Sequence, residues 1–432
     1  PAGWVAPAGA AECSRCARGS AAKTAGAGTC ELCLIGRFTN TEGNVDCDAC
    51  PPRGVDCPGG TAVVQEAMWY PSGTALNSST ILYDCLGPET CNVTDAGTTV
   101  LCAEGHHGVL CGECNATHTR SKNKCVECPN VKDSVLSLVA VFGVLYVVLM
   151  YNALHTDGKE NKSSSTVLWR IFISYFTVAS TVGDFPIRGT KVFQEFIDYF
   201  TKVAKSLDFG FVPIVCQTSI KFFNVFVLKA LVPYFVVLSV GLGLCVMLRF
   251  WPGSEVTTVQ RLVSSAVYVV YYLYTSMVTH LLRLFHCTDP IHGNGFNGET
   301  FLFTDLSIRC DSKEYKGAQV VVVVFLFFYL VAVPGLIYWI TVRNKHRLDD
   351  PAFRAMFGFV FVGYQRDAAW WEVVVLARKL ALVAVLVFAS TDKFLQSVFA
   401  LFVLLVETAA QASTTPSAYT RPRLSCAAAY PC

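Results

Sequence analysis

The chain contains few charged residues and has almost no net charge. Only 15% of its 432 residues are Asp, Glu, Lys or Arg, and the formal net charge is +2. So small a charge creates no field that would attract nucleic acid or an acidic substrate. The hydrophobic fraction of 53% and the mean hydropathy of +0.44 exceed those of soluble globular proteins. The composition excludes an ordinary soluble protein and predicts a membrane protein.

Motifs of the common enzyme classes are also missing. The sequence contains no glycine-rich phosphate loop, no HExxH motif and no convincing Ser/His/Asp arrangement. We therefore expect a protein that is not an enzyme, with no catalytic residues, metal site or cofactor. The first residue is Pro1, and no charged-then-apolar signal segment follows it. We expect the sequence to begin inside a longer polypeptide, although removal of a signal segment would give the same start.

Long apolar runs are absent from the first 130 residues, which hold 14 of the 20 cysteines. A segment rich in Gly, Thr, Asn and Pro cannot stabilise itself by a hydrophobic core and needs covalent links. Five Cys-x-x-Cys pairs occur here, and the first three recur at a 17-residue step, which indicates a repeat. We predict growth-factor-receptor-like repeats over residues 1–60 and a membrane-proximal cysteine-rich module over 61–130. The five pairs are Cys13/Cys16, Cys30/Cys33, Cys47/Cys50, Cys111/Cys114 and Cys125/Cys128.

Cys-x-x-Cys pairs also bind zinc, so two interpretations compete. Glycosylation sequons at Asn77, Asn92 and Asn115 favour disulfides, because glycans are added only on the lumenal side. Spacing alone does not prove the pairing, but the repeat step favours a ladder of short loops, each contributing about 2–3 kcal/mol. Cys13 is left over, and we expect it to pair with a cysteine upstream of Pro1. The ladder comprises Cys16–Cys30, Cys33–Cys47, Cys50–Cys57, Cys85–Cys91, Cys102–Cys111 and Cys114–Cys125.

Residues 131–412 contain the long apolar runs. Ser134–Leu154 is an uncharged run of 21 residues, long enough to cross about 30 Å of hydrocarbon. We predict a disulfide-rich ectodomain of small β and loop repeats followed by an all-α bundle of seven transmembrane helices, with the N-terminus outside. Residues 413–432 are a short tail that we assign to no span. The expected spans are 134–154, 167–186, 230–248, 262–282, 317–342, 370–390 and 394–412.

Basic residues set the predicted orientation. The loop 343–368 contains five of them and is therefore expected in the cytoplasm. This orientation places Cys287 and Cys310 in one extracellular loop, where they can form a disulfide. Residues 190–206 have one apolar and one charged helical face, which predicts a helix lying in the outer interface. It leads to Cys216, which we pair with Cys128 as a link between head and membrane region.

Four charged residues fall inside the last two expected spans: Glu372, Arg378, Lys379 and Glu407. A charge at the bilayer centre costs about 2.5–3.5 kcal/mol on insertion scales, so such groups usually face protein or water. Counted inward from the cytoplasmic ends of these two antiparallel spans, Arg378 and Glu407 lie at similar depth. We therefore predict that Glu407 pairs with Arg378 or Lys379. The pair is either a structural link between the two helices or part of a gate or ion pathway. The tyrosines of the span 262–282 are interpreted as packing residues rather than as a ligand cage.

Three stretches resemble a known group of proteins. They are Cys102-Ala-Glu-Gly-His-His-Gly-Val-Leu-Cys111 running on to Cys128, Asp305-Leu-Ser-Ile-Arg-Cys310, and Gly358–Tyr364 with Trp370-Trp371-Glu372 through Leu380. They are similar to algal and protist surface proteins with ephrin-type-A/B-receptor-like repeats and a TRP-like or G-protein-coupled-receptor-related membrane region. The resemblance covers most of residues 30–411 and implies architecture more than activity. Long ectodomains in that group agree with the unpaired Cys13.

Three functions fit these expectations. The first is an anchor that organises an extracellular assembly at the plasma membrane, with the ciliary or flagellar surface as one candidate location. The second is a channel or channel subunit of TRP or polycystin type. The third is a seven-span receptor, although Asp-Arg-Tyr and Asn-Pro-x-x-Tyr signatures are missing. The expected partners are the lipid bilayer, N-linked glycans and other extracellular or membrane chains, and not nucleic acid.

Overall fold

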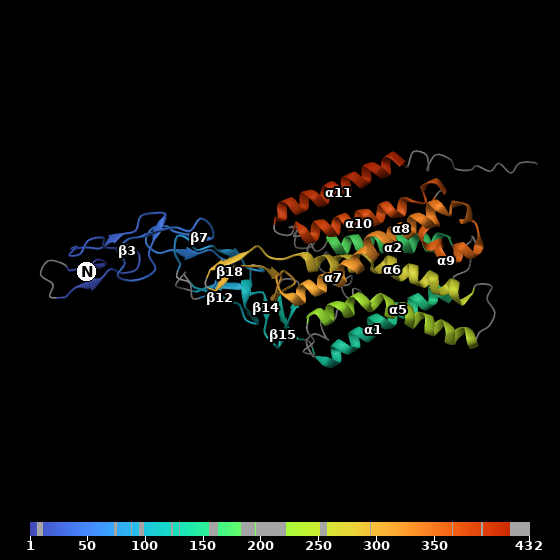
Figure 1. The fold of residues 1–432 in the computed structure, drawn as a ribbon, viewed down its shortest axis with the longest axis horizontal. Coiled ribbons are helices and arrows are strands. Elements are labelled where there is room, and N and C mark those ends of the chain that lie inside the picture. Colours follow the sequence, from blue (N-terminus) through green and yellow to red (C-terminus); the bar gives the residue numbers. More distant parts are fainter. Residues whose placement is uncertain are drawn as a thin grey trace, which may run out of the picture. The chain divides into compact units, whose positions relative to one another are not determined.

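The computed structural model describes residues 1–6, 12–72, 76–87, 89–94, 99–121, 124–128, 130–154, 163–182, 195, 222–250, 257–293, 295–364, 366–389 and 392–414. The chain forms two compact units (Figure 1). The first, called the head, contains the residues up to Val131 together with Cys287–Gly317. The second, called the helical body, contains the described residues from Lys132 to His286 and from Ala318 onward. Each unit is built differently.

The head consists of short antiparallel hairpins. All its sheets in the described residues have two strands, and most strands have only two residues. Hairpins this short are not stable in water by themselves, so other contacts must hold them. In the first 130 residues the pairs are β1 (Trp4–Val5) with β2 (Ser14–Arg15), β3 (Ser20–Ala21) with β4 (Glu31–Leu32), β5 (Arg37–Phe38) with β6 (Asp48–Ala49), β7 (Val55–Asp56) with β8 (Val63–Val64), β9 (Met68–Trp69) with β10 (Tyr83–Asp84), β11 (Cys91–Val93) with β12 (Val100–Cys102), β13 (His106–His107) with β14 (Glu113–Cys114), and β15 (His118–Ser121) with β16 (Lys124–Glu127).

Disulfides join these hairpins. The structure contains all six bridges of the ladder that the repeat step favours. Cys287 and Cys310 form a seventh, which confirms the pairing expected from the sequence. Cys128 is also disulfide-bonded, while its predicted partner Cys216 lies outside the described residues. The disulfide interpretation of the cysteine pairs is therefore confirmed.

Backbone hydrogen bonds stack one repeat on the next. The N–H of Gly19 donates to the carbonyl of Thr39 at 2.9 Å, and the N–H of Thr39 donates to that of Gly60 at 3.0 Å. Gly3 shows how close the chains come. Its φ is +82°, and a Cβ there would lie 2.0 Å from the carbonyl oxygen of Gly43, so only glycine fits. The repeat therefore depends on main-chain contacts more than on a large core.

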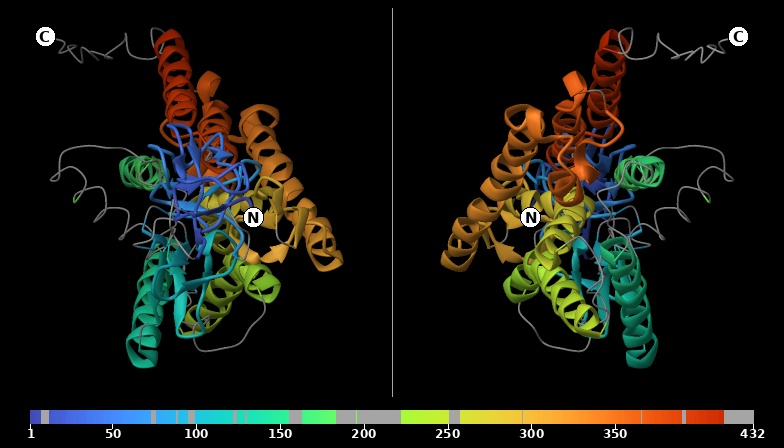
Figure 2. Two further views of the ribbon diagram at one scale, coloured as in Figure 1. Left: turned by 90° about the vertical axis from the view of Figure 1, so that its left-hand side faces the viewer. Right: turned by 90° about the vertical axis from the view of Figure 1, so that its right-hand side faces the viewer.

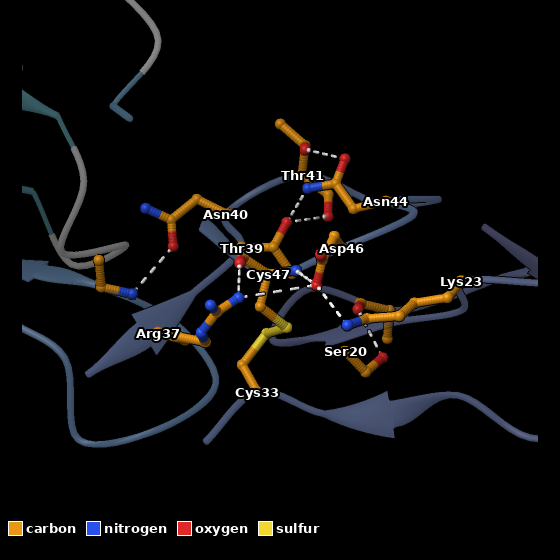
Figure 3. Close-up of a disulfide and its surroundings, with 12 residues drawn as sticks. Ser20, Lys23, Cys33, Arg37, Thr39, Asn40, Thr41, Asn44, Asp46 and Cys47 are labelled. Carbon is orange, nitrogen blue, oxygen red and sulfur yellow. Dashed lines mark hydrogen bonds and ion pairs between the residues drawn. A yellow bond between two sulfur atoms is a disulfide. The ribbon is translucent and has the colours of Figure 1, made fainter. Parts of the chain in front are cut away.

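The Cys33–Cys47 disulfide has a polar surrounding that Figure 3 shows in close-up. Asp46 accepts a hydrogen bond from the backbone N–H of Cys47 at 2.8 Å. Lys23 lies 3.4 Å and Arg37 lies 3.8 Å from the same carboxylate. The Cys47 N–H lowers the pKa of Asp46, partial desolvation opposes this, and Lys23 and Arg37 lower the pKa further. The carboxylate thus tightens one repeat without being buried.

The loop between the fourth and fifth expected spans is part of the head. It contains the hairpins β17 (Ile291–Gly293) with β18 (Phe296–Glu299) and β19 (Phe301–Leu302) with β20 (Asp305–Arg309). Leu306 is buried in the cluster that contains Trp69 and Cys111. Its Cδ1 lies 2.1 Å from where Gly112 would carry a Cβ. The sequence placed this loop outside the membrane, and the structure adds that it completes the core of the membrane-proximal module.

The helical body coincides with the apolar runs of the sequence. Four described helical segments are long and apolar enough to cross a membrane: Phe222–Met247, Thr258–Phe285, Lys313–Arg343 and Phe394–Ala412. The π-helical segments η4 and η5 lie within the third of these. The other expected spans coincide with α1, α2 and α10 over their described residues. The elements are α1 (Val131–Leu154), α2 (Ser163–Val182), α5 (Phe222–Phe250), α6 (Thr258–Leu282), α7 (Lys313–Phe327), η4 (Phe328–Ala332), α8 (Val333–Tyr338), η5 (Trp339–Arg343), α9 (Pro351–Phe361), α10 (Trp371–Phe388) and α11 (Lys393–Thr414).

Helix α6 lies at the centre of the body and packs against α5, α9 and α10. Helices α10 and α11 run side by side, as both views in Figure 2 show. The basic loop 343–368 differs from the open loop that its charges suggested, because its middle forms α9. Asp350 caps this helix, Pro351 begins it, and Phe353 and Phe359 are buried. Its apolar residues are therefore used to cover α6.

Two parts of the sequence prediction lie outside the described residues. One is the amphipathic segment 190–206, of which only Glu195 is described, together with Cys216. The other is the tail from residue 415 onward.

Candidate functional site

The helical body contains an unusual group of buried charged and polar side chains. We call Arg170, Tyr271, Tyr364, Glu372 and Lys379 the buried charge cluster. Arg170, Glu372 and Lys379 are 5%, 1% and 1% exposed. Buried ionisable groups in apolar surroundings are costly unless they are paired. These buried side chains therefore need specific partners, and the contacts that supply them are described next.

Glu372 begins α10 and is the acceptor around which the cluster is arranged. The hydroxyl of Tyr271, on α6, donates to one carboxylate oxygen. The hydroxyl of Tyr364 donates to the other oxygen at 2.9 Å. The Nε of Arg170, on α2, lies 3.5 Å from that second oxygen. Three side chains from three segments thus satisfy one buried carboxylate.

Arg170 uses its remaining donors on the end of α9. Its Nη1 donates to the carbonyls of Phe359 and Val360 at 3.1 and 3.0 Å. Carbonyls in the last turn of a helix have no partner within the helix, and cations are favoured there. The guanidinium also lies 4.4 Å from the centroid of the Tyr364 ring. Arg170 therefore connects α2 to both α9 and α10.

Tyr364 follows α9 in the loop that leads to α10. Burial raises the pKa of its hydroxyl, and the charge of Glu372 raises it further. The hydroxyl consequently keeps its proton and remains a donor to Glu372 at any physiological pH.

Glu407 pairs with Arg378. The ion pair joins α10 to α11, and the two side chains are 18% and 10% exposed. A second nitrogen of Arg378 lies 3.3 Å from the hydroxyl of Ser174 on α2. Of the two partners that the sequence allowed for Glu407, the structure selects Arg378.

Lys379 has a different environment from Arg378. Its Nζ lies 4.4 Å from the centroid of the Tyr271 ring, a cation–π distance. Within the described residues this nitrogen has no hydrogen-bond partner. Tyr271 thus contacts Lys379 with its ring and Glu372 with its hydroxyl.

Arg261 is a second buried cation that serves a helix end. It is 3% exposed and donates at 2.7 Å to the carbonyl of Ala153, near the C-terminus of α1. The neighbouring Leu154 carbonyl accepts from the same nitrogen. This contact fastens the end of α1 to the start of α6.

Sequence reasoning identified Glu372, Arg378, Lys379 and Glu407 but missed Arg170 and Tyr364. Arg170 is a charged residue near the start of the expected span 167–186, and this position in an apolar run indicates a buried partner. Tyr364 lies in a loop and carries no local signal. Tyr268 and Tyr271 of α6 pack on Phe359, with ring centroids 4.6 and 5.2 Å away. The packing interpretation missed the second role of Tyr271, whose hydroxyl donates to Glu372.

The arrangement is suited to holding helices together. The acid is surrounded by donors. A carboxylate that accepts hydrogen bonds on both oxygens is a poor general base. The cluster therefore fixes α2, α6, α9 and α10 against one another.

The sequons of the head lie on accessible loops and strands. Asn92, on β11, and Asn115 are exposed. Asn77 is half-buried, and its side-chain oxygen accepts from the N–H of Ser79 at 2.9 Å. Exposure at Asn92 and Asn115 leaves room for a glycan at either position.

Comparison with known proteins adds to this geometry. Residues 19–65 match the family described as tyrosine-protein kinase ephrin type A/B receptor-like. The chain is also similar to cysteine repeat modular protein A of Toxoplasma gondii, with 26% identity over 120 residues. That match covers 27% of this chain and only 4% of the relative. No solved structure matches the chain.

The expected ephrin-receptor-like character is thus confirmed for the repeat segment. The chain is a cysteine-rich repeat protein with several apolar helices, which is consistent with a membrane protein of the surface. The TRP-like character of the helical body stays a prediction.

Proposed function

We propose that this protein is a non-enzymatic polytopic protein of the cell surface that anchors or organises an extracellular assembly through its cysteine-rich head. The construction of the head carries the proposal. The segment Cys287–Gly317, between α6 and the greater part of α7, is built into the head's core and closed by Cys287–Cys310. The head is therefore joined to the body by more than one chain crossing. Such a connection resists pulling better than a single flexible linker does.

Proteins built from cysteine-rich repeats support this assignment. The one relative described above is named for its cysteine repeats, and residues 19–65 are similar to an ephrin-receptor-like module. Repeat arrays present extended surfaces to partners. We infer that the partners of the head are other extracellular or membrane proteins, and that the head carries N-linked glycans at Asn92 and Asn115.

The membrane topology in this proposal has seven crossings with the head outside. Helices α1, α2 and α10 join the four long apolar segments to give that number. The basic residues of 343–368 favour the cytoplasmic side. The two ends of α6 then lie on opposite sides, with Cys287 outside. We place the protein in the plasma membrane, with the ciliary surface as one candidate location.

A channel or channel subunit is the second candidate, because ionisable side chains are buried in the body. The contacts weigh against it: Glu372 accepts from three donors, and Arg378 is paired with Glu407. A conduction path needs charged groups that face water rather than each other. The buried charges are better explained as links between helices.

The deciding experiment combines cross-linking with current recording on the full chain. Cells expressing the protein are treated with an amine cross-linker that does not cross membranes, and proteins linked to the head are identified by mass spectrometry. The anchor proposal expects specific extracellular chains linked to the head and no current from purified protein in planar bilayers. A current that Arg378→Ala abolishes, and that Arg366→Ala leaves unchanged, would instead establish the channel. Arg366 is the matched control because it is an exposed basic residue paired with Asp349.

A further inference from the structure

His106 joins the last two hairpins in the first 130 residues of the head. It lies on β13, opposite Cys114 of β14, whereas Cys125 lies on β16 in the following hairpin. The backbone nitrogen of Cys125 is 2.9 Å from the ring Nε2 of His106. The ring Nδ1 is 3.0 Å from the carbonyl oxygen of Glu104. Both ring nitrogens are therefore bonded to main-chain groups.

These two partners fix the protonation of the ring. The backbone N–H of Cys125 can only donate, so Nε2 accepts and carries no proton. The carbonyl of Glu104 can only accept, so Nδ1 donates and carries the single proton of the ring. His106 is thus held as the neutral imidazole with its proton on Nδ1. A second proton has to go to Nε2, where two donors would then face each other.

Among the described residues, no carboxylate forms an ion pair with His106 that would favour the second proton. Glu113 lies 3.6 Å from the neighbouring His107 instead, and Lys124 pairs with Glu89. The elements packed on β13 are β14, the 3-10 turn η1 (Val109–Cys111) and, through Cys125, the hairpin β15–β16. Their ionisable side chains, with those beside His106 in the sequence, are Glu104, His107, Glu113, His118, Arg120, Lys124 and Glu127, and η1 has none.

The contact lies where it affects the next part of the chain. Hairpin β15–β16 is the last element of the head before α1. The Cys114–Cys125 disulfide also attaches it to β14, and the N–H of Asn115 donates to the carbonyl of Gly105 at 3.0 Å. If the bond from Cys125 to His106 is lost, the disulfide keeps the hairpin attached. The hairpin then lacks one of the main-chain contacts that orient it.

We propose that His106 is a proton-binding site that makes the junction between hairpins β13–β14 and β15–β16 sensitive to mildly acidic pH. At neutral pH, Nε2 accepts from Cys125 and the junction is closed. Histidine changes its charge between about pH 5 and 8. As the pH falls and Nε2 gains a proton, the Cys125 N–H loses its acceptor and the last hairpin loosens. This response does not depend on which partners the head binds.

The test is amide hydrogen exchange of the full chain in lipid nanodiscs, read by mass spectrometry on the peptide that contains Cys125. Free amides themselves exchange at a rate that depends on pH, so each variant is compared with the unchanged protein at one pH. At about pH 7.5, His106→Gln and the unchanged protein should exchange equally slowly, because the glutamine amide oxygen can accept from Cys125. At about pH 5 the unchanged protein should exchange about tenfold faster than His106→Gln.

His106→Ala tests the site even if glutamine does not reproduce the acceptor. It has no acceptor at either pH, so Cys125 should exchange about tenfold faster than in the unchanged protein at about pH 7.5 and equally fast at about pH 5. His107→Gln is the matched control on the same strand. The His107 side chain is 52% exposed and faces Glu113, and its protonation would strengthen that pair. This variant should keep the full difference between the two pH values.

Three results would overturn the proposal. The first is equal exchange at Cys125 in the unchanged protein and in both His106 variants at each pH, which would mean that the contact protects nothing. The second is acid-induced exchange that persists in His106→Gln and His106→Ala, which would place the titrating group elsewhere. The third is a pH response that His107→Gln abolishes, which would make the pair with Glu113 the proton-sensitive contact.

Discussion

The head and the helical body both have to offset the conformational entropy that the chain loses on folding, and they do so in different ways. The head has hairpins whose strands contain two to five residues, small clusters of buried side chains, and disulfides that close short loops. The described residues of the body form helices without disulfides, held by apolar packing and a few buried charges. The difference teaches that covalent links replace a core where the chain is short of apolar residues.

Ion pairs show the same contrast. In the head, Arg53 and Asp84 lie 2.7 Å apart, but their side chains are 66% and 64% exposed, and such pairs contribute at most about 1 kcal/mol. In the body, Arg170 and Glu372 are 6% and 1% exposed. Breaking one partner of a buried pair leaves an uncompensated charge. Breaking an ion pair between an arginine and an acid is therefore expected to lower the stability of the body much more than that of the head.

The largest expected effect is that of Glu372→Ala in the body. The change leaves Arg170 charged and buried, and it deprives the hydroxyls of Tyr271 and Tyr364 of their acceptor. We expect the free energy of unfolding to fall by about 3–5 kcal/mol, measured by denaturation in mixed micelles. Asp349→Ala is the control, since it breaks the exposed pair with Arg366 and should cost less than about 1 kcal/mol. Equal losses in the two variants would remove the contrast between buried and exposed pairs.

An intermediate effect is expected when one disulfide of the head is removed. Replacing Cys102 and Cys111 together by alanine opens a short loop in the cluster that contains Leu306. The head should lose about 2–4 kcal/mol and become sensitive to protease, while the helical signal in far-UV circular dichroism stays unchanged. Cys13→Ala is the control, because Cys13 is exposed and forms no disulfide with the described residues of this chain. A parallel loss of helical signal would mean that the two units do not unfold separately.

The smallest effect concerns Asp46 and the pH. Its pKa in the folded head is lower than the ordinary 3.8, chiefly because the Cys47 N–H donates to the carboxylate. The folded state therefore gains stability from this group above that value and loses it as the pH falls through the lowered pKa. Asp46→Asn should flatten the pH dependence of head unfolding in the acid range. If Asp46→Asn and the unchanged protein show the same pH dependence of unfolding in the acid range, the hydrogen bond from Cys47 to Asp46 does not stabilise the head in solution.

Much of the architecture was predictable because the signals are local. The 17-residue step of the cysteine pairs favoured Cys16–Cys30 and Cys33–Cys47, and the structure has both bridges. Apolar runs predicted where the helices lie, although four segments rather than seven meet the length and composition of a span among the described residues. Helix α9 was missed because the five basic residues within and around it dominated the pattern. Its apolar face is explained only by the contact with α6.

By itself, the sequence determined the division into a covalently linked head and an apolar body, and it placed Arg378 and Glu407 at similar depth. These conclusions depend on composition, spacing and chain length, which neighbouring residues define. Only the tertiary structure decided that Glu372 meets Tyr271, 101 residues away, and that Leu306 completes a core in the head. Neither contact has a local signal, because a buried carboxylate or leucine is satisfied by whichever segments the packing of the whole chain brings beside it.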